Sequence, residues 1–263
     1  MNRSAEWRSV FAARLLNMKG CYTDPQPRRN LRSSPEQTST RPNPAQYGGA
    51  RMRIRTLFAE NHPIVMEGLC RVFDRNEYEL VGRAADGHAA VRAAAALKPD
   101  IIILETALPL LNGIEAALRI RQQNAAIKLI FLTTQDDAPS VRRAFRAGGN
   151  GYVLKSSDAS ELLVAAREVM AGRRYISPVI TLAGERALAE IGSSHGFGNT
   201  LSMRQREVLQ LVAEGKTAKE AAEILHISVK TVDFHKTNLM DILGVRSSVD
   251  LARYAIQHGV TRQ

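Results

Sequence analysis

The stretch PDIIILETALPLLNG, residues 99–113, decides the fold of the longer part of this chain. Its apolar run at 101–104 is followed at once by Glu105, then by turn residues and an Asn-Gly pair that opens a helical pattern. A short run in which every side chain is apolar is typical of a strand covered on both faces, as in parallel sheets with helices on either side. The stretch therefore predicts a buried parallel strand that ends beside a carboxylate.

The same alternation of strand and helix is repeated on both sides of this stretch. Apolar strand patterns lie at 54–59, 78–84, 100–104, 127–133 and 151–154, and each is followed by a helical pattern, at 62–75, 86–98, 112–123, 136–148 and 157–172. Strands that alternate with helices in this way predict a doubly wound parallel sheet, here of five strands. Residues 53–172 are therefore expected to form one α/β domain.

Polar side chains stand at the ends of several of these predicted strands. Glu60 and Asn61 follow the first strand, Thr133 ends the fourth, Glu105 follows the third and Lys155 follows the fifth. In doubly wound sheets the functional groups lie beyond the carboxyl ends of the strands. We therefore expect these five side chains to meet in one pocket.

The motifs ENHPIVMEGL, PDIIILETALPLLNG, LTTQDD and AGGNGYVLK occur in this order across residues 53–172. They resemble the receiver domain of two-component response regulators, which has a flavodoxin-like fold. The resemblance implies that an Asp after the third strand accepts a phosphoryl group, that an acidic pair after the first strand holds Mg²⁺, and that a hydroxyl and a lysine contact the phosphoryl oxygens. It assigns the hydroxyl to Thr133 rather than Thr134, the lysine to Lys155 and the switch aromatic to Tyr152.

Two positions depart from the receiver pattern. Glu105 stands at the phosphoacceptor position, and its extra methylene carries the carboxylate outward by roughly 1.5 Å, which is unfavourable for in-line attack in a preorganised site. Asn61 replaces the second acid, so Glu60 and Asn61 offer Mg²⁺ only a weak site, because the ion prefers carboxylate oxygens. We therefore expect a receiver that works without ordinary phosphorylation and without a cofactor. Glu105 either pairs with Lys155 and stabilises the fold, or partly imitates the phosphorylated state.

The last part of the chain, residues 199–263, carries start signals for four short helices. Capping residues open them at Ser202 with Gln205, Thr217 with Glu220, Ser228, and Ser247 with Asp250. Only the turn 226–228 separates the second helix from the third, which is the helix-turn-helix pattern. We therefore expect a small all-α domain whose third helix has a polar and aromatic face opposite an apolar one.

The motif LSMRQREVLQLVAEGKTAKEAAEILHISVKTVDFHKTNLMDILGV covers most of this segment and resembles the LuxR-type output domain of the NarL/FixJ response regulators. The resemblance implies that the third helix enters the major groove of double-stranded DNA. Carried over position by position, it places Asp233, Phe234 and Thr237 on the base-facing side. It gives phosphate or flanking contacts to Lys216, Lys219, Lys230, Thr231, His235, Lys236 and Asn238.

The segments outside the two domains are assigned by composition. Residues 1–52 hold nine Lys and Arg against three acids and are rich in Ser, Pro and Gly, which favours a disordered basic extension. A nonspecific phosphate-binding arm and a targeting segment are the alternatives. Residues 173–198 are expected to form a linker helix, at 177–191, and a flexible loop. Two distant cysteines favour a reducing cytoplasm over a disulfide scaffold, and no apolar run is long enough to span a membrane.

Together these patterns predict a sequence-specific transcription regulator of two-component type that acts as a cytoplasmic homodimer on DNA and is not an enzyme. A sensor kinase or another response regulator is the expected protein partner, and no membrane is involved. The alternative is a signalling interaction module, in which the atypical receiver heterodimerises with a typical response regulator and modulates it. Specific DNA binding by residues 199–263, in competition with random DNA, distinguishes the two functions.

Overall fold

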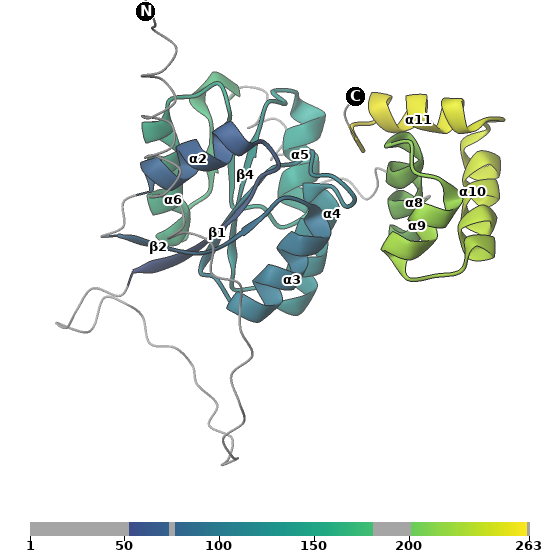
Figure 1. Cartoon of the computed structure of the whole chain (residues 1–263). Helices are drawn as coiled ribbons and strands as arrows, with labels where there is room; N and C mark the ends of the chain where they lie inside the picture. Colours follow the sequence, from purple (N-terminus) through teal and green to yellow (C-terminus); the bar gives the residue numbers. More distant parts are fainter. Residues whose placement is uncertain (1–52, 74–76, 181–200, 262–263) are drawn as a thin grey trace, which may run out of the picture. The chain divides into compact units, whose positions relative to one another are not determined.

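The computed structural model describes residues 53–73, 77–180 and 201–261 (Figure 1). The predictions for residues 1–52 and for the segment 181–198 lie outside these ranges. An α/β part, residues 53–180, and a helical part, residues 201–261, are built around separate apolar clusters and are described one at a time. No helix in the described ranges is both long enough and apolar enough to cross a lipid bilayer.

The α/β part is a parallel sheet of six strands in the order β2-β1-β3-β4-β5-β6. The strands are β1 (Ile54–Ala59), β2 (Tyr78–Ala84), β3 (Ile101–Leu104), β4 (Lys128–Thr133), β5 (Gly151–Leu154) and β6 (Tyr175–Ile176). The central strand β3 is buried at every residue, as its apolar run predicts. The doubly wound α/β fold expected from the sequence is therefore confirmed.

The sixth strand corrects the prediction of five. Tyr175 and Ile176 pair with Gly151 and Tyr152 of β5, within the segment 173–198 that was assigned to the linker. The short 3₁₀ helix η3 (Pro178–Ile180) then replaces the predicted start of a linker helix. A two-residue edge strand is too short to produce a periodic pattern in the sequence, so hydrogen bonding to β5 decides the conformation of this segment.

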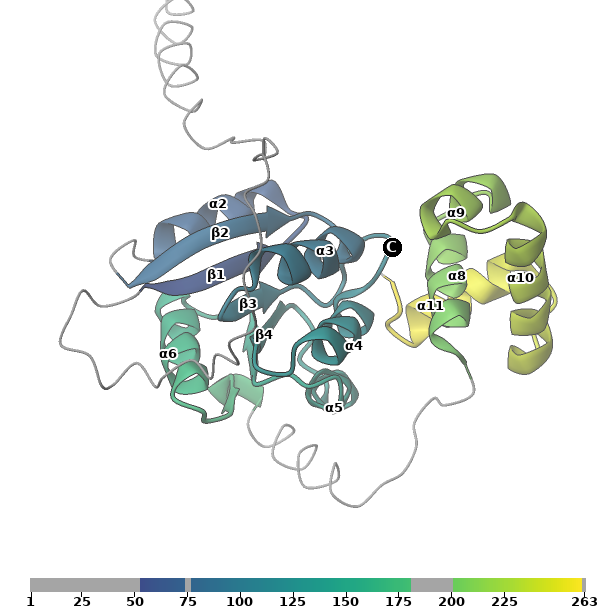
Figure 2. The same cartoon turned by 90° about the horizontal axis from the view of Figure 1, so that it is seen from below.

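Helices cover both faces of the sheet (Figures 1 and 2). One face is packed by α2 (Pro63–Val72) and α6 (Ala159–Met170), and the other by α3 (Gly87–Leu97), α4 (Gly113–Gln123) and α5 (Ala138–Arg146). Alternate residues of β5 serve the two cores, because Val153 belongs to the α2/α6 cluster and Tyr152 to the other. The two cores therefore hold β5 from both faces of the sheet.

The helical part consists of α8 (Met203–Ala213), α9 (Ala218–Leu225), α10 (Val229–Leu243) and α11 (Ser248–Gln257). Its predicted starts are confirmed, since Ser202 and Thr217 form complete capping boxes and Ser228 and Ser247 cap α10 and α11. The turn between α9 and α10 contains His226 in the left-handed region, with φ of 54°. This part is an all-α domain with the predicted helix-turn-helix, α9 to α10.

Candidate functional site

Three charged side chains meet at the carboxyl edge of the sheet. Glu60 follows β1, Glu105 follows β3 and Lys155 follows β5, so separate strands deliver them to the same edge. The ammonium of Lys155 lies 2.6 Å from Oε2 of Glu60 and also pairs with Oε2 of Glu105. The side chain of Lys155 is only 11% exposed and both carboxylates are buried, so the cluster is a buried ion-pair network.

The start of α4 holds the loop that carries Glu105. The backbone N–H of Gly113 donates to the carbonyl of Thr106 at 2.8 Å, and a Cβ on Gly113 would lie 2.0 Å from the carbonyl oxygen of Glu105. Only glycine permits this approach. The Asn-Gly pair of the sequence motif therefore fixes the position of the Glu105 loop as well as the start of the helix.

The two oxygens of Glu60 have different partners. Oε1 accepts a hydrogen bond from the backbone N–H of His62 at 2.9 Å and lies 2.7 Å from Nδ1 of the same residue. Oε2 faces Lys155. Glu60 is therefore fixed from two sides, by His62 at the N-cap of α2 and by Lys155, which follows β5.

The two oxygens of Glu105 are likewise both engaged. Oε1 accepts from the hydroxyl of Thr106 and from the backbone N–H of Ala107, each at 2.9 Å, while Oε2 pairs with Lys155. Burial alone would raise the pKa of Glu105, but the hydrogen bond from Lys155, the Ala107 N–H, the Lys155 charge and the Thr106 hydroxyl together lower the pKa below its ordinary value. The structure therefore favours the ionised form of Glu105.

A chain of hydrogen bonds connects Glu105 with Tyr152. Since the Thr106 hydroxyl donates to Glu105, the Thr133 hydroxyl donates to Oγ1 of Thr106, at 2.7 Å. Oγ1 of Thr133 accepts from the backbone N–H of Gln135 at 3.2 Å, and the carbonyl of Gln135 accepts from the hydroxyl of Tyr152 at 2.9 Å. Four hydrogen bonds, two of which meet at the backbone of Gln135, therefore connect Glu105 with the buried ring of Tyr152.

Asn61 differs from the other members of the pocket. Its Oδ1 is buried and has no hydrogen-bond partner in the part of the chain that the structure describes. The donors offered to a metal ion here are thus two carboxylates that already share an ammonium and one neutral amide oxygen. Within the described ranges, no three His, Cys, Asp or Glu side chains gather in a group suited to a metal ion.

A second candidate surface lies on α10. Val232 and Leu239 are buried in the core of the helical part, whereas Asp233, Phe234 and Thr237 are exposed. The exposed fraction of Phe234 is 61%, which is high for an aromatic residue. Aromatic residues are enriched at contact surfaces, and this face is the one that the sequence predicts to read DNA bases.

The start of α10 is fixed by its cap. The Ser228 hydroxyl accepts from the backbone N–H of Thr231 at 3.1 Å and lies 2.8 Å from the Thr231 hydroxyl. Lys230 in the first turn is exposed. A helix N-terminus carries partial positive charge, so this end of α10 adds to the attraction of a lysine for phosphate.

Comparison with known proteins finds relatives for both parts. Residues 56–167 match the family model of the response regulator receiver domain, and residues 199–255 match that of the bacterial regulatory proteins of the luxR family. The oxygen regulatory protein NreC of Staphylococcus aureus (strain JH9) is 32% identical over 212 residues, which cover 78% of this chain and 97% of NreC. The chain belongs to the LuxR-family response regulators.

Solved structures are similar as well. A two-component response regulator of the LuxR family from Aurantimonas sp. SI85-9A1 is 37% identical and has a TM-score of 0.50. The match covers 53% of this chain and 100% of the Aurantimonas chain. The RcsB response regulator of Salmonella typhimurium is 24% identical over 78% of this chain and 98% of its own, with a TM-score of 0.54, which shows the fold alone. The two family matches show that this response regulator combines a receiver domain with a LuxR-type DNA-binding domain.

The receiver pocket of this response regulator contains most of the residues singled out in its sequence. Lys155 contacts both Glu60 and Glu105. At the end of β4, Thr133 is buried and Thr134 is exposed. Thr133 reaches Glu105 only through a residue that sequence reasoning missed, Thr106. His62, which holds Glu60, was missed too. The position of Thr106, directly after the acid that follows β3, was an available signal, whereas His62 is preceded by Asn61 and carried no such signal.

The remaining predicted DNA contacts lie on α9, α10 and the turn before α9. Lys219 is exposed, and Lys216, Thr231, His235, Lys236 and Asn238 are half-buried. The His235 ring lies edge-on to Phe234, with 5.8 Å between the ring centroids. His235 therefore supports the exposed aromatic ring, and the assigned contacts with DNA remain predictions.

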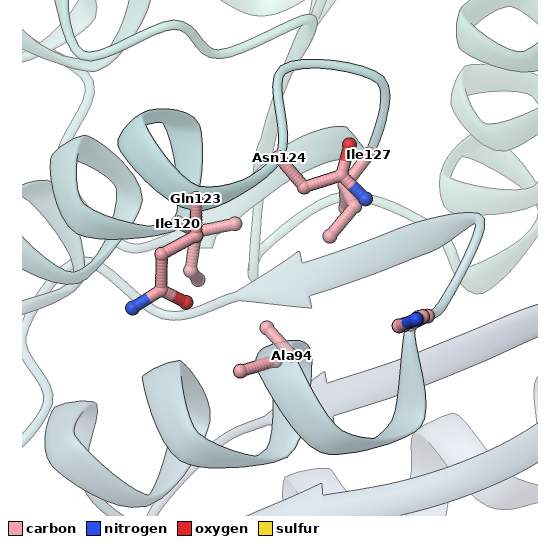
Figure 3. A pocket seen from close by; sticks show the side chains of 7 residues that line it. Ala94, Ile120, Gln123, Asn124 and Ile127 are labelled. Carbon is pink, nitrogen blue, oxygen red and sulfur yellow. The ribbon is translucent and has the colours of Figure 1, made fainter. Parts of the chain in front are cut away.

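A separate cavity of about 220 Å³ lies between α3 and α4, at the opposite edge of the sheet from the acidic pocket (Figure 3). Ala94, Ile120 and Ile127 provide an apolar floor, and Gln123 and Asn124 lie at its rim. Both of these amide residues are exposed, and Oδ1 of Asn124 accepts a hydrogen bond from the backbone N–H of Ala126 at 2.9 Å. We assign no function to this cavity.

Proposed function

We propose that this response regulator is a sequence-specific transcription regulator that reads DNA with the exposed face of α10. The observation that supports this most strongly is the division of α10 into a buried side, Val232 and Leu239, and an exposed side with Asp233, Phe234 and Thr237. The names of its relatives describe regulators, which supports regulation rather than catalysis. The LuxR-type domain supplies the DNA-binding module.

Each side chain of the exposed face has a chemical role in this proposal. Asp233 accepts a hydrogen bond from the amino group of cytosine, Phe234 contacts the methyl group of thymine, and Thr237 bonds to either kind of base edge. Lys219 and Lys230 bind phosphate and fix the register of the helix on the duplex. One good base contact is worth about 1–3 kcal/mol, so a single copy reads only a short half-site. We infer that two copies bind two half-sites.

We further propose that the receiver works without stoichiometric phosphorylation. At the phosphoacceptor position, the Glu105 carboxylate already pairs with Lys155 and accepts two hydrogen bonds. A negative group at this place interacts with the same lysine that would answer a phosphoryl group. Both the bond network and the longer side chain support a pocket whose charge is set by Glu105 rather than by a sensor kinase.

Magnitudes limit how far Glu105 can imitate a phosphoryl group. A hydrogen bond to a charged group is worth about 1.5–3 kcal/mol, whereas moving an equilibrium from 1:99 to 99:1 takes about 5.5 kcal/mol. The contacts of Glu105 therefore shift a balanced receiver but do not reverse a strongly biased one. Partial imitation and plain stabilisation of the fold differ in one respect, because only the first makes DNA affinity depend on Glu105.

The test uses the full chain and a random DNA library. Selection is expected to enrich one motif with the wild type and to lose the preference at one base pair of that motif with Phe234→Ala, while incubation with acetyl phosphate labels the wild type far below one phosphoryl group per chain. Glu105→Asp with Asn61→Asp is the positive control for labelling. Stoichiometric labelling of the wild type that disappears in Glu105→Ala would contradict the proposed independence. If no motif is enriched and the chain instead associates with a typical response regulator, it is an interaction module.

A further inference from the structure

Lys155 occupies the centre of the acidic pocket. Its ammonium contacts one oxygen of Glu60, at 2.6 Å, and one oxygen of Glu105. The other oxygen of each carboxylate is held by neighbouring protein groups, by His62 at Glu60 and by Thr106 at Glu105. Each carboxylate is therefore fixed at both oxygens, and the place between them is taken by a cation that belongs to the chain.

With the Lys155 ammonium in place, the cluster keeps one net negative charge. Two carboxylates and one ammonium sum to −1, and the neutral Asn61 adds nothing. A divalent cation added to this set would make the cluster +1, whereas with an acid at position 61 the same ion would bring it to zero. Charges a few ångströms apart interact strongly when they are shielded from water, so this difference of one charge decides which cation the pocket accepts.

We propose that Lys155 is the resident cation of this pocket and that its bridge between Glu60 and Glu105, together with the neutral Asn61, closes the pocket to divalent cations such as Mg²⁺. An entering Mg²⁺ needs oxygen ligands in near-octahedral geometry at about 2.0–2.1 Å, so it has to displace the ammonium from both carboxylates. The displaced ammonium, with a side chain 11% exposed, then lies beside a dication in a poorly hydrated site.

This inference deepens the proposed phosphorylation independence and rests on it for its biological meaning, but cation binding is measured by itself. Two residues exclude the divalent cation in this proposal, Lys155 by its charge and Asn61 by its lack of one, so each is tested by a variant. Lys155→Met removes the resident cation at nearly constant volume and leaves two buried carboxylates that need a counter-ion. Asn61→Asp keeps Lys155 and adds one negative charge without changing the size of the side chain. Both variants are expected to open the pocket to a divalent cation.

The experiment titrates the full chain with Mn²⁺ as the probe and follows free Mn²⁺ by electron paramagnetic resonance. The wild type is expected to bind Mn²⁺ at least about tenfold more weakly than Asn61→Asp or Lys155→Met. Adding Glu60→Gln to each variant identifies binding in the pocket, because that binding must then disappear. Lys128→Met is the matched control. It removes a lysine at the start of β4, which lies at the opposite edge of the sheet from the pocket, and is expected to behave as the wild type does.

One site per wild-type chain that is abolished by Glu60→Gln and has an affinity like that of Asn61→Asp would overturn the proposal. The same holds if neither Asn61→Asp nor Lys155→Met gains a site that depends on Glu60. Thermal denaturation with and without Mg²⁺ gives a second readout, since a ligand that binds only the folded state raises Tm. If Lys155→Met does not fold, Asn61→Asp carries the test alone.

The outcome is separable from that of the proposed function. Labelling by acetyl phosphate in a wild type that binds no pocket Mn²⁺ refutes phosphorylation independence and leaves the resident cation in place. If the wild type binds Mn²⁺ in the pocket but is never labelled by acetyl phosphate, the resident-cation proposal is refuted and phosphorylation independence stands.

Discussion

Oγ1 of Thr106 lies 2.7 Å from Oγ1 of Thr133, and both side chains are buried at the carboxyl ends of adjacent strands. Because the Thr106 hydroxyl donates to Glu105, the two hydroxyls act in series. Thr133 has the hydroxyl that the sequence assigned to the pocket, yet it contacts Glu105 only through Thr106. The pocket is therefore completed by a residue that directly follows its central acid.

Thr106→Val is expected to destabilise the receiver. The change keeps the volume of the side chain but leaves Glu105 with one donor fewer and the Thr133 hydroxyl without its acceptor, which costs about 1–3 kcal/mol. Urea unfolding measures the loss. Thr134→Val, at the exposed neighbouring position, is the control and is expected to stay within about 0.5 kcal/mol of the wild type. Equal stability of the two variants would mean that the hydroxyl series contributes nothing.

Tyr152→Phe tests the other end of the hydrogen-bond chain. The ring is fully buried and stays packed, but the bond of its hydroxyl to the Gln135 carbonyl, at 2.9 Å, is lost. The expected cost is about 0.5–1.5 kcal/mol. In a double-mutant cycle with Thr106→Val, coupling above about 0.5 kcal/mol indicates that the chain acts as a unit. Strict additivity would show that the two ends are energetically independent.

The effect of Glu105→Gln on the free energy of unfolding is expected to depend on pH. The folded-state pKa of Glu105 is lowered because Lys155, Ala107 and Thr106 outweigh the effect of burial. A carboxylate of this kind adds stability that is complete above its unfolded-state pKa and is lost as the pH falls through the lower folded-state pKa. The difference in free energy of unfolding between wild type and Glu105→Gln is therefore expected to be about 1.5–3 kcal/mol near neutral pH and to shrink in acid.

The measurement is urea unfolding over a series of pH values from neutral to acid. Glu168→Gln is the matched control, because Glu168 also pairs with a cationic side chain, Arg173, but at the surface, where ion pairs contribute little. A Glu105→Gln difference that stays constant or grows toward acid pH would contradict the ionised, lysine-bound state of Glu105.

The sequence predicts the parts of this fold that rest on long patterns. The run at 101–104 is fully buried as β3 and the run at 151–154 as β5, because burial on both faces demands apolar residues throughout. The ends of β1 and β2 also coincide with their predicted patterns, although these strands are only partly buried. Strand β6 (Tyr175–Ile176) was missed, since two residues carry no period and its conformation depends on hydrogen bonds to β5. Tertiary context, not local propensity, forms that strand.

The candidate site divides in the same way. The order of strands brings Glu60, Glu105 and Lys155 together, so their meeting follows from topology alone. The role of Thr106 depends on which way a hydroxyl in a loop is directed, and that direction is fixed by the Gly113 backbone against the loop. Such an orientation is a property of packing that a pattern of residue types does not contain.

Lys230→Ala is expected to weaken DNA binding without changing the preferred sequence. Lys230 is exposed in the first turn of α10, where a phosphate contact is sequence-independent. Loss of one such contact reduces the slope of log K against log salt by about 0.9. Fluorescence anisotropy over a salt series measures the slope, with Lys128→Ala as the control. An unchanged slope would remove Lys230 from the set of phosphate contacts.

Phe234→Ala is expected to act in the opposite manner. The ring is 61% exposed and carries no charge, so its removal leaves the salt slope and the folding stability close to those of the wild type. Loss of an apolar contact to a thymine methyl lowers the affinity for the selected motif by about 1–3 kcal/mol, and relaxes the preference at one base pair. Ile64→Ala, which removes another exposed apolar side chain, on α2, is the control. Competition binding against motifs changed at single positions locates the base pair. A uniform loss over all sequences would make Phe234 a support for the helix rather than a reader of bases, and the specificity of α10 would then rest on Asp233 and Thr237.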